Sequence, residues 1–149
     1  MLALVQRVSM AQVRIAGTTI GAIERGMLVF VCAEPSDSEA HAVKLVDKLL
    51  KLRIFGDDAG KMNRSVQDVR GGLLIVSQFT LAADTGGGNR PGFSGAAPPQ
   101  QGRALYERVL ALAREHHAPV ACGEFGADMQ VELVNDGPVT LLLDSRKRF

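Results

Sequence analysis

The segment Gly71-Gly72-Leu73-Leu74-Ile75-Val76-Ser77-Gln78-Phe79-Thr80-Leu81 contains an apolar run that becomes polar at its end. Branched apolar residues occupy both odd and even positions after the two glycines. This pattern predicts a strand over 73–81 that is buried on both faces. Strand alternation would place Ser77 and Phe79 on one face, with Gln78 and Thr80 on the other. Polar groups at such a strand end either form the wall of a site or bond to local backbone where the strand leaves the sheet.

A second segment, Leu133-Val134-Asn135-Asp136-Gly137-Pro138-Val139-Thr140, places a Gly-Pro peptide between two strand-like stretches. Glycine permits close approach of another group, proline lacks an N–H donor, and an X-Pro bond adopts cis at modest cost. Two interpretations are open. The segment is a turn or bulge that ends an edge strand, or it displays two carbonyl oxygens side by side to a ligand.

The remaining chain reads as short strands and two helices. The N-terminal part of the chain predicts a meander of strands. Apolar and polar residues alternate loosely over 2–13, short strand-like pieces follow around Gly17 and Gly21, and 27–33 is apolar. Further short strands are expected at 52–55, 120–121, 129–134 and 139–143. The stretch 82–102, rich in glycine, proline and alanine, is expected to be a loop of functional importance next to Thr80.

The first helix is expected after Ser36-Asp37-Ser38-Glu39, which has the spacing of a capping box. Apolar residues at helical spacing follow (Ala42, Leu45, Val46 and Leu49), with a lysine stripe opposite (Lys44, Lys48 and Lys51). Pro98-Pro99 opens a second helix over 100–117, with Leu105, Val109 and Leu112 facing inward. We therefore predict a single α+β domain over 1–149, with a mainly antiparallel, partly barrel-like β-sheet and two helices packed outside.

Composition limits the class of protein. The apolar fraction of 46% is ordinary for a soluble globule, the apolar runs are too short to span a bilayer, and Gln6 and Arg7 interrupt any signal-peptide core. We expect a cytoplasmic protein with no membrane partner. A net charge of +1 argues against a protein that coats DNA or RNA, although it permits one that grips the end of a single RNA. Cys32 and Cys122 lie far apart in the sequence, so we expect buried reduced thiols and not two ligands of one metal ion.

The candidate site segments contain no histidine, cysteine or glutamate. The chain also shows no Ser-His-Asp arrangement, no metal-ligand spacing and no nucleotide-binding Gly-rich loop, so we expect neither a metal nor a cofactor. An enzyme built from these segments must use backbone dipoles, one or two hydroxyls and a group brought by the substrate.

The order of these motifs resembles the D-aminoacyl-tRNA deacylase family, formerly called D-tyrosyl-tRNA deacylases. The likeness covers nearly the whole chain and is carried by residues 3–8, 52–55, 60–63, 76–84, 90–94, 126–131 and 135–140. The chain departs from the family at Gly92, where a serine is usual, and at the flexible stretch Gly86-Gly87-Gly88-Asn89. The tail 144–149 lies where the family varies, so nothing carries over to it.

The resemblance implies a homodimer that hydrolyses the ester between a D-amino acid, or glycine mischarged on tRNA(Ala), and the terminal adenosine of tRNA. The catalytic segment would be Ser77, Gln78, Phe79 and Thr80, with backbone N–H groups near Phe79 and Thr80 stabilising the oxyanion. The 2′-hydroxyl of the terminal ribose would assist the attack, and no cofactor or DNA partner is implied.

The resemblance further implies that the Gly137-Pro138 bond is cis and that this segment enters the pocket of the other subunit. Its carbonyl groups would hold the substrate amino group, and Arg7 would fix the segment. An L side chain would then meet the wall of the pocket, so selection would act by exclusion. Met129 is a candidate for lining the pocket, with core packing as the alternative role.

A second function class is also compatible with these residues. In a non-catalytic homodimeric binding module, the Gly-Pro segment would be a dimer-forming edge and the polar strand end would bind a small metabolite. The lysine stripe and the basic residues Arg146, Lys147 and Arg148 either contact RNA or are solvated surface. Arg90, the only cation in the long loop, either meets a phosphate or faces water.

Overall fold

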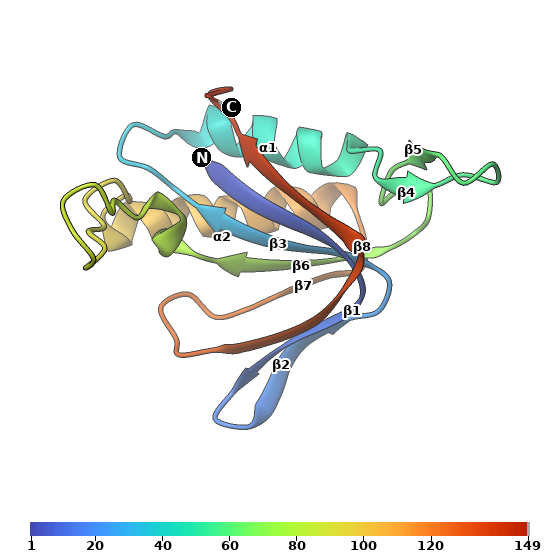
Figure 1. Ribbon diagram of the computed structural model, residues 1–149, viewed down its shortest axis with the longest axis horizontal. Helices are drawn as coiled ribbons and strands as arrows, with labels where there is room; N and C mark the ends of the chain where they lie inside the picture. The colour runs from blue at the N-terminus through green and yellow to red at the C-terminus, as the bar shows by residue number, and fades with distance from the viewer. Residues whose placement is uncertain (149) are drawn as a thin grey trace.

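Strand β1 (Leu2–Ile15) organises the sheet because three other strands pair with it, all antiparallel. Its first half pairs with β3 (Gly26–Cys32) and its second half with β2 (Thr18–Ile23), while β8 (Gln130–Asp144) runs along its other edge. The structure, a computed structural model, describes residues 1–148. Figure 1 shows β1 and β8 curving together across the sheet.

The other side of β3 continues the sheet with two parallel strands, β6 (Gly72–Ser77) and then β7 (Val120–Cys122). Parallel neighbours require long crossover connections, and the two helices supply them. α1 (Glu39–Lys51) lies between β3 and β6 in the chain, and α2 (Pro99–His116) lies between β6 and β7. The predicted α+β, mainly antiparallel and barrel-like sheet is confirmed, with the parallel centre as a feature that the sequence pattern did not indicate.

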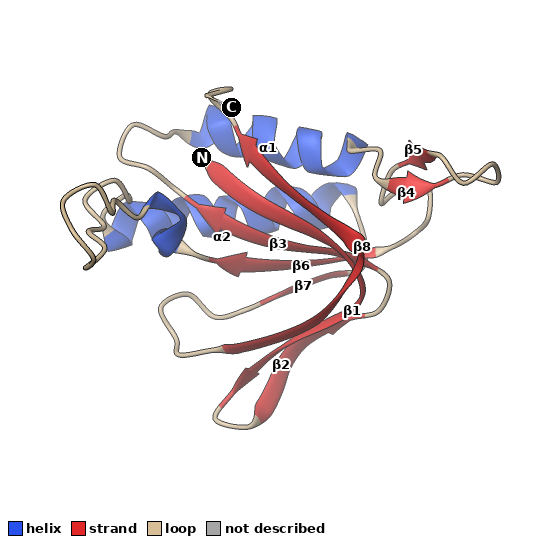
Figure 2. Cartoon of the chain, in the orientation of Figure 1, coloured by secondary structure: helices blue, strands red, loops and turns tan. Residues whose placement is uncertain are grey.

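The curled sheet has two apolar cores, one on each face of β3 and β6. Both helices pack on the same face (Figure 2) and cover the larger core, which includes Val29, Leu45, Val109 and Ile75. The smaller core, which includes Leu28, Leu74 and Val131, fills the inside of the curl. Burial of β6 on both faces is therefore confirmed, as are the inward faces of both helices.

Three predicted boundaries were wrong. β6 ends at Ser77 instead of continuing to Leu81, because its neighbour β3 ends at Cys32, and a one-turn helix η1 (Phe79–Ala82) follows. The stretch 52–55 is not a strand. Instead, β4 (Phe55–Gly56) pairs with β5 (Met62–Arg64) in a separate two-stranded sheet.

The third boundary is the start of α1, where Ser38 and not Ser36 is the cap. The Nδ1 atom of His41 accepts a hydrogen bond from the Ser38 N–H at 3.0 Å, which moves the start two residues along the chain. The strands expected at 129–134 and 139–143 also form one continuous β8. Within residues 1–148, no helix is long and apolar enough to cross a membrane, and both cysteines are free thiols.

Candidate active site

A mainly apolar pocket of about 590 Å³ lies at the carboxyl ends of β3 and β6, the left-hand end of the sheet in Figure 1. The start of α2, the helix η1 and the segment before β8 close its sides. The residues predicted for the site that line it are Ser77, Gln78, Phe79 and Met129. Other lining residues were not singled out as site residues from the sequence, among them Val31, Phe93, Tyr106 and Phe125.

The turn after β6 determines how Ser77 to Thr80 are presented. The Gln78 N–H donates to the Val31 carbonyl at 2.8 Å, and the chain then enters η1, so Gln78 and Thr80 do not alternate across a strand as predicted. The Gln78 Nε2 atom donates to Thr80 Oγ1 at 2.5 Å, and Thr80 lies beside the pocket lining, not within it. Within residues 1–148, no hydrogen bond uses the N–H of Phe79 or Thr80. One unpaired backbone donor, the Phe79 N–H, therefore belongs to the pocket lining, and a second, the Thr80 N–H, lies beside it.

Aromatic and thioether side chains form another part of the pocket lining. Phe79 is 54% exposed, and the Phe93 ring meets it edge to face with centroids 5.0 Å apart. Met129 Sδ accepts a hydrogen bond from the Glu124 N–H at 3.4 Å, which orients the side chain at the pocket wall.

The long loop is held where Phe93 enters the site. Asp84 and Gly92 exchange two backbone hydrogen bonds, each 2.8 Å long, so the predicted loop contains a small β-bridge. A Cβ atom on Gly92 would have its nearest neighbour, the Asp84 carbonyl oxygen, at 3.9 Å. The serine usual at this position would fit, so the glycine leaves the loop path unchanged.

The pocket contains no activated nucleophile among the described residues. Burial, followed by the nearby Glu34 carboxylate, raises the pKa of the Cys32 thiol to about 11. Burial also raises the pKa of Tyr106, whose hydroxyl donates to the Ile75 carbonyl at 2.9 Å. Asp128 is exposed, and no histidine lines the pocket. Both the thiol and the phenol are protonated at neutral pH, so neither is a ready nucleophile or base.

This protonation predicts the behaviour of Cys32→Ala. We expect the variant to keep kcat/KM within about threefold of wild type, because loss of a working nucleophile would cost far more than ~10²-fold. Single-turnover assays on purified protein measure the effect, with Cys122→Ala as the matched control. A hundredfold loss confined to Cys32→Ala would show that the thiol takes part in the chemistry.

The Gly137-Pro138 segment is an outward excursion of β8. Gln6 pairs with Thr140 and Val8 pairs with Asn135, so four residues, 136–139, lie opposite Arg7 alone. Arg7 Nε donates to the Asp136 carbonyl at 2.9 Å, and Arg7 Nη1 donates to the Ile54 carbonyl at 2.7 Å. The Gly137-Pro138 peptide is cis, and both residues are exposed. The guanidinium therefore ties the base of the excursion to the β4 region.

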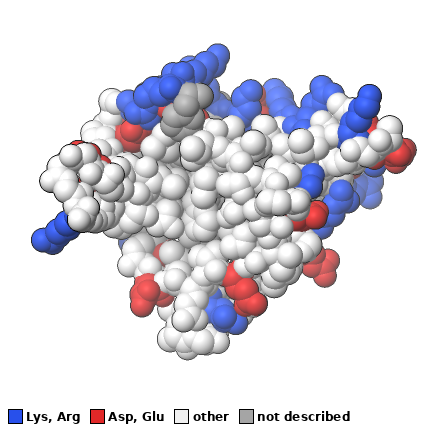
Figure 3. All heavy atoms as spheres, in the orientation of Figure 1, with Lys and Arg blue, Asp and Glu red and all other residues white. Residues whose placement is uncertain are grey.

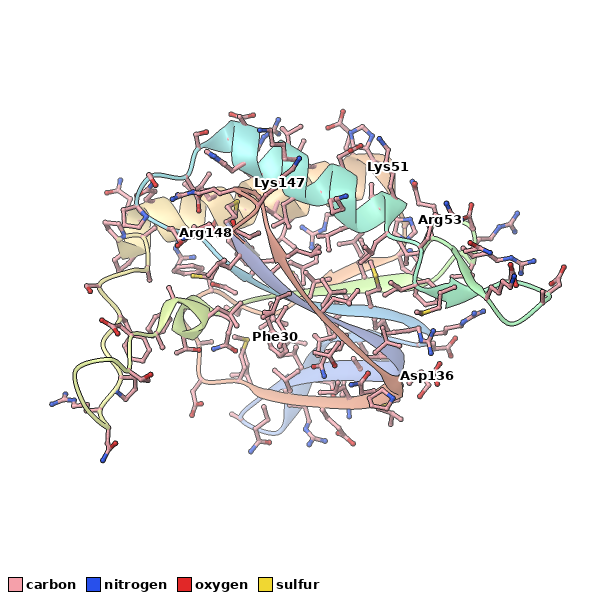
Figure 4. All side chains as sticks on the ribbon, turned by 45° about the horizontal axis from the view of Figure 1, so that its top comes forward. Phe30, Lys51, Arg53, Asp136, Lys147 and Arg148 are labelled. Carbon is pink, nitrogen blue, oxygen red and sulfur yellow. The ribbon has the colours of Figure 1, made fainter. Side chains whose placement is uncertain are left out.

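Within one chain, this segment lies apart from the pocket. Figure 4 shows Asp136 at the right-hand bend of β8, whereas η1 lies at the far left. Arg7, Gly137 and Pro138 are absent from the pocket lining. The structure thus brings together four of the predicted site residues, places Thr80 beside them and leaves these three at the other end of the sheet.

The fold and this pocket define a class of barrel-like α+β domains with a site at the end of the sheet. A family model described as D-Tyr-tRNA(Tyr) deacylase matches residues 4–144. A D-aminoacyl-tRNA deacylase from Methylibium petroleiphilum is 71% identical over 143 residues, which are 96% of this chain and 94% of the relative. Another from Azoarcus sp. is 64% identical and covers 96% of this chain and 95% of its own.

A solved structure named c-Myc DNA Unwinding Element Binding Protein superposes with a TM-score of 0.92 at 41% identity, covering 97% of this chain and 98% of its own. The chain belongs to the D-Tyr-tRNA(Tyr) deacylase family.

Proposed function

We propose that this protein hydrolyses the ester bond of D-aminoacyl-tRNA, and of glycyl-tRNA mischarged on tRNA(Ala), as a homodimer. The observation that carries the proposal is the segment from Ser77 to Thr80. Ser77, Gln78 and Phe79 line an apolar pocket, and the N–H groups of Phe79 and of the adjacent Thr80 have no acceptor among the described residues. Fixed N–H dipoles are the usual means of stabilising the oxyanion of an ester under attack. The family membership supports the same reaction.

The separation between pocket and Gly-Pro segment supports the dimer. A two-fold axis repeats every contact, so if one segment enters the partner's pocket, the partner's segment enters the first pocket. β8 exposes Val134 (52%) just before the excursion. We propose that the partner chain covers this side chain when the excursion enters the partner's pocket.

Selection for D-amino acids would follow from two fixed points on the substrate. We propose that the carbonyl groups of Gly137 and Pro138 accept hydrogen bonds from the substrate amino group, while the N–H groups at Phe79 and Thr80 bind the ester oxygen. With both points held, an L side chain would be directed at the pocket wall and a D side chain away from it. Rejection by exclusion operates whatever the identity of the side chain.

The catalytic step would draw on the substrate, because the described pocket lining has no histidine and its one carboxylate, Asp128, is exposed. We propose that the 2′-hydroxyl of the terminal ribose, which neighbours the ester, assists the attack of water. The protein would then contribute positioning and oxyanion stabilisation.

Incubation with D- and L-tyrosyl-tRNA tests the reaction directly. We expect the D-ester to be cleaved at least about a hundredfold faster than the L-ester, since steric rejection in a fixed pose exceeds the 10–200-fold of a single methylene. The measurement is release of labelled amino acid under single-turnover conditions. Binding of either ester without release would instead identify a non-catalytic binding module.

A further inference from the structure

The cations of the chain are unevenly distributed even though the net charge is +1. Figure 3 shows Lys and Arg gathered along the top of the molecule, above α1 and the C-terminal segment, whereas acids and bases mix on the lower part. Lys44, Lys48 and Lys51 form the exposed stripe of α1. Residues three and four apart on a helix have Cβ atoms about 5–6 Å from each other, so these three lysines lie in one row along the helix.

Between this stripe and the end of β8 lies a groove of about 630 Å³. Lys44 and Lys48 enter it from α1, and Lys147 enters it from the C-terminal turn. Figure 4 shows Lys147 next to α1, on the same side of the molecule as Lys51. Within the described part of the chain, no acidic group pairs with these three lysines, although Asp47 on the groove wall pairs with Lys51. We call this surface the lysine groove.

The C-terminal turn is built to hold Lys147 there. Arg146 Nη2 donates to Asp37 at 2.9 Å, and Arg148 pairs with Glu34 and Asp144. The Lys147 N–H donates to the Asp144 carbonyl at 2.9 Å, and Lys147 itself has a φ of +58°. Both arginines are therefore bound to acids of the protein, which leaves the middle residue of the basic triplet as the cation free to meet a partner.

The same contacts place the lysine groove next to the pocket. Glu34, which anchors Arg148, follows directly on Cys32 and Ala33, which line the pocket. The amino group of Met1, another lining residue, donates to Asp37, which anchors Arg146, and to Ser145 Oγ in the groove. A polyanion whose end occupies the pocket can therefore continue over the C-terminal turn onto α1. Flexible lysines bind phosphate as point charges without reading base sequence, which suits a substrate class with many tRNA sequences.

We propose that the lysine groove binds the backbone phosphates of the acceptor end of tRNA while the esterified adenosine occupies the pocket. The proposal rests on the proposed function, which it extends by assigning the RNA-contacting surface. Three leucines and two aspartates also line the groove, and the aspartates, Asp47 and Asp144, pair with Lys51 and Arg148. The partner is a phosphate polyanion and not an acidic protein segment, because the groove lies next to the pocket in which we place the esterified adenosine.

The triple variant Lys44→Gln, Lys48→Gln, Lys147→Gln tests the proposal. We expect kcat/KM on D-aminoacyl-tRNA at about 0.15 M salt to fall roughly ten- to fortyfold, and the slope of log kcat/KM against log salt to flatten by about 2, as for the loss of three phosphate contacts. Activity on D-aminoacyl-adenosine, which lacks those phosphates, should stay at the wild-type value.

A matched control removes the same charge elsewhere: Arg14→Gln, Lys61→Gln, Arg64→Gln. Equal losses in both triple variants would overturn the proposal, as would an equal loss on D-aminoacyl-adenosine or an unchanged salt slope.

Binding of uncharged tRNA, followed by fluorescence anisotropy, is measured in parallel. If wild type cleaves neither substrate, the proposed function fails, and the anisotropy difference between the two variants still decides the role of the groove. Tight wild-type binding that the groove variant retains would indicate that the groove serves another partner.

Discussion

Gly137→Ala is expected to lower kcat/KM for D-aminoacyl-tRNA by about a hundredfold or more while the protein stays folded. Gly137 has a φ of +138°, and an added Cβ atom would lie 2.8 Å from Val139 Cγ2 and 2.9 Å from Val139 N. It would also lie 3.1 Å from Arg7 Nη2, the guanidinium that holds the excursion. The segment must therefore shift, and a displacement of about 1 Å in a positioning group can cost ~10² in rate.

The cost to folding should be smaller, about 1–3 kcal/mol for one strained backbone position. Single-turnover deacylation and thermal unfolding measure the two effects separately. Gly17→Ala is the matched control, because Gly17 also has a positive φ (+81°) but has nothing within 4 Å of the added carbon. Wild-type turnover by Gly137→Ala would contradict the backbone filter.

Mixing two inactive variants tests whether the segment acts on the partner's pocket. Ser77→Phe fills the pocket but leaves the excursion intact, whereas Gly137→Ala does the reverse. In a mixed dimer, one pocket is intact and faces an intact segment from the other chain, so activity should return toward a quarter of wild type when equal amounts exchange subunits. No recovery after verified exchange would place pocket and segment in the same chain.

Local patterns in the sequence predicted those parts of the fold that local forces determine. The helix α1 follows from its apolar spacing, and the buried β6 follows from its branched residues on both parities. The predicted end of β6 was wrong because the end of a strand depends on its neighbour. Since β3 ends at Cys32, the residues after Ser77 have no further strand to pair with. No pattern within 73–81 contains that information.

The candidate site divides in the same way. Ser77 to Phe79 and Met129 were found by motif and do line one pocket. Tyr106 joins them through the packing of α2 against the sheet, and Phe125 packs against Tyr106 from the segment before β8. The basic triplet 146–148 was the least predictable part. Arg148 pairs with the nearby Asp144, but the triplet's other acidic partners, Glu34 and Asp37, are more than a hundred residues away and reach the C-terminal turn only in the folded chain.

Replacing the terminal adenosine of the substrate with its 2′-deoxy form is expected to slow deacylation by about 10²–10⁴-fold, the range typical of a lost acid–base group. Thr80→Ala should cost less than about tenfold. Thr80 Oγ1 accepts a hydrogen bond from the Gln78 amide, and among the described residues no histidine or carboxylate is hydrogen-bonded to it. The backbone N–H of residue 80 survives the substitution, and with it the proposed oxyanion contact.

Both effects are measured as single-turnover rates, each divided by the rate of alkaline hydrolysis of the same ester, which removes the intrinsic reactivity of the 2′-deoxy compound. We then expect the normalised rate to fall further for the wild-type enzyme with the 2′-deoxy ester than for Thr80→Ala with the ordinary ester. Cys32, the only thiol in the pocket lining, is held protonated by burial and does not alter this order. A dead Thr80→Ala enzyme beside normal cleavage of the 2′-deoxy ester would reverse the assignment, because the reacting hydroxyl would then belong to the protein and not to the RNA.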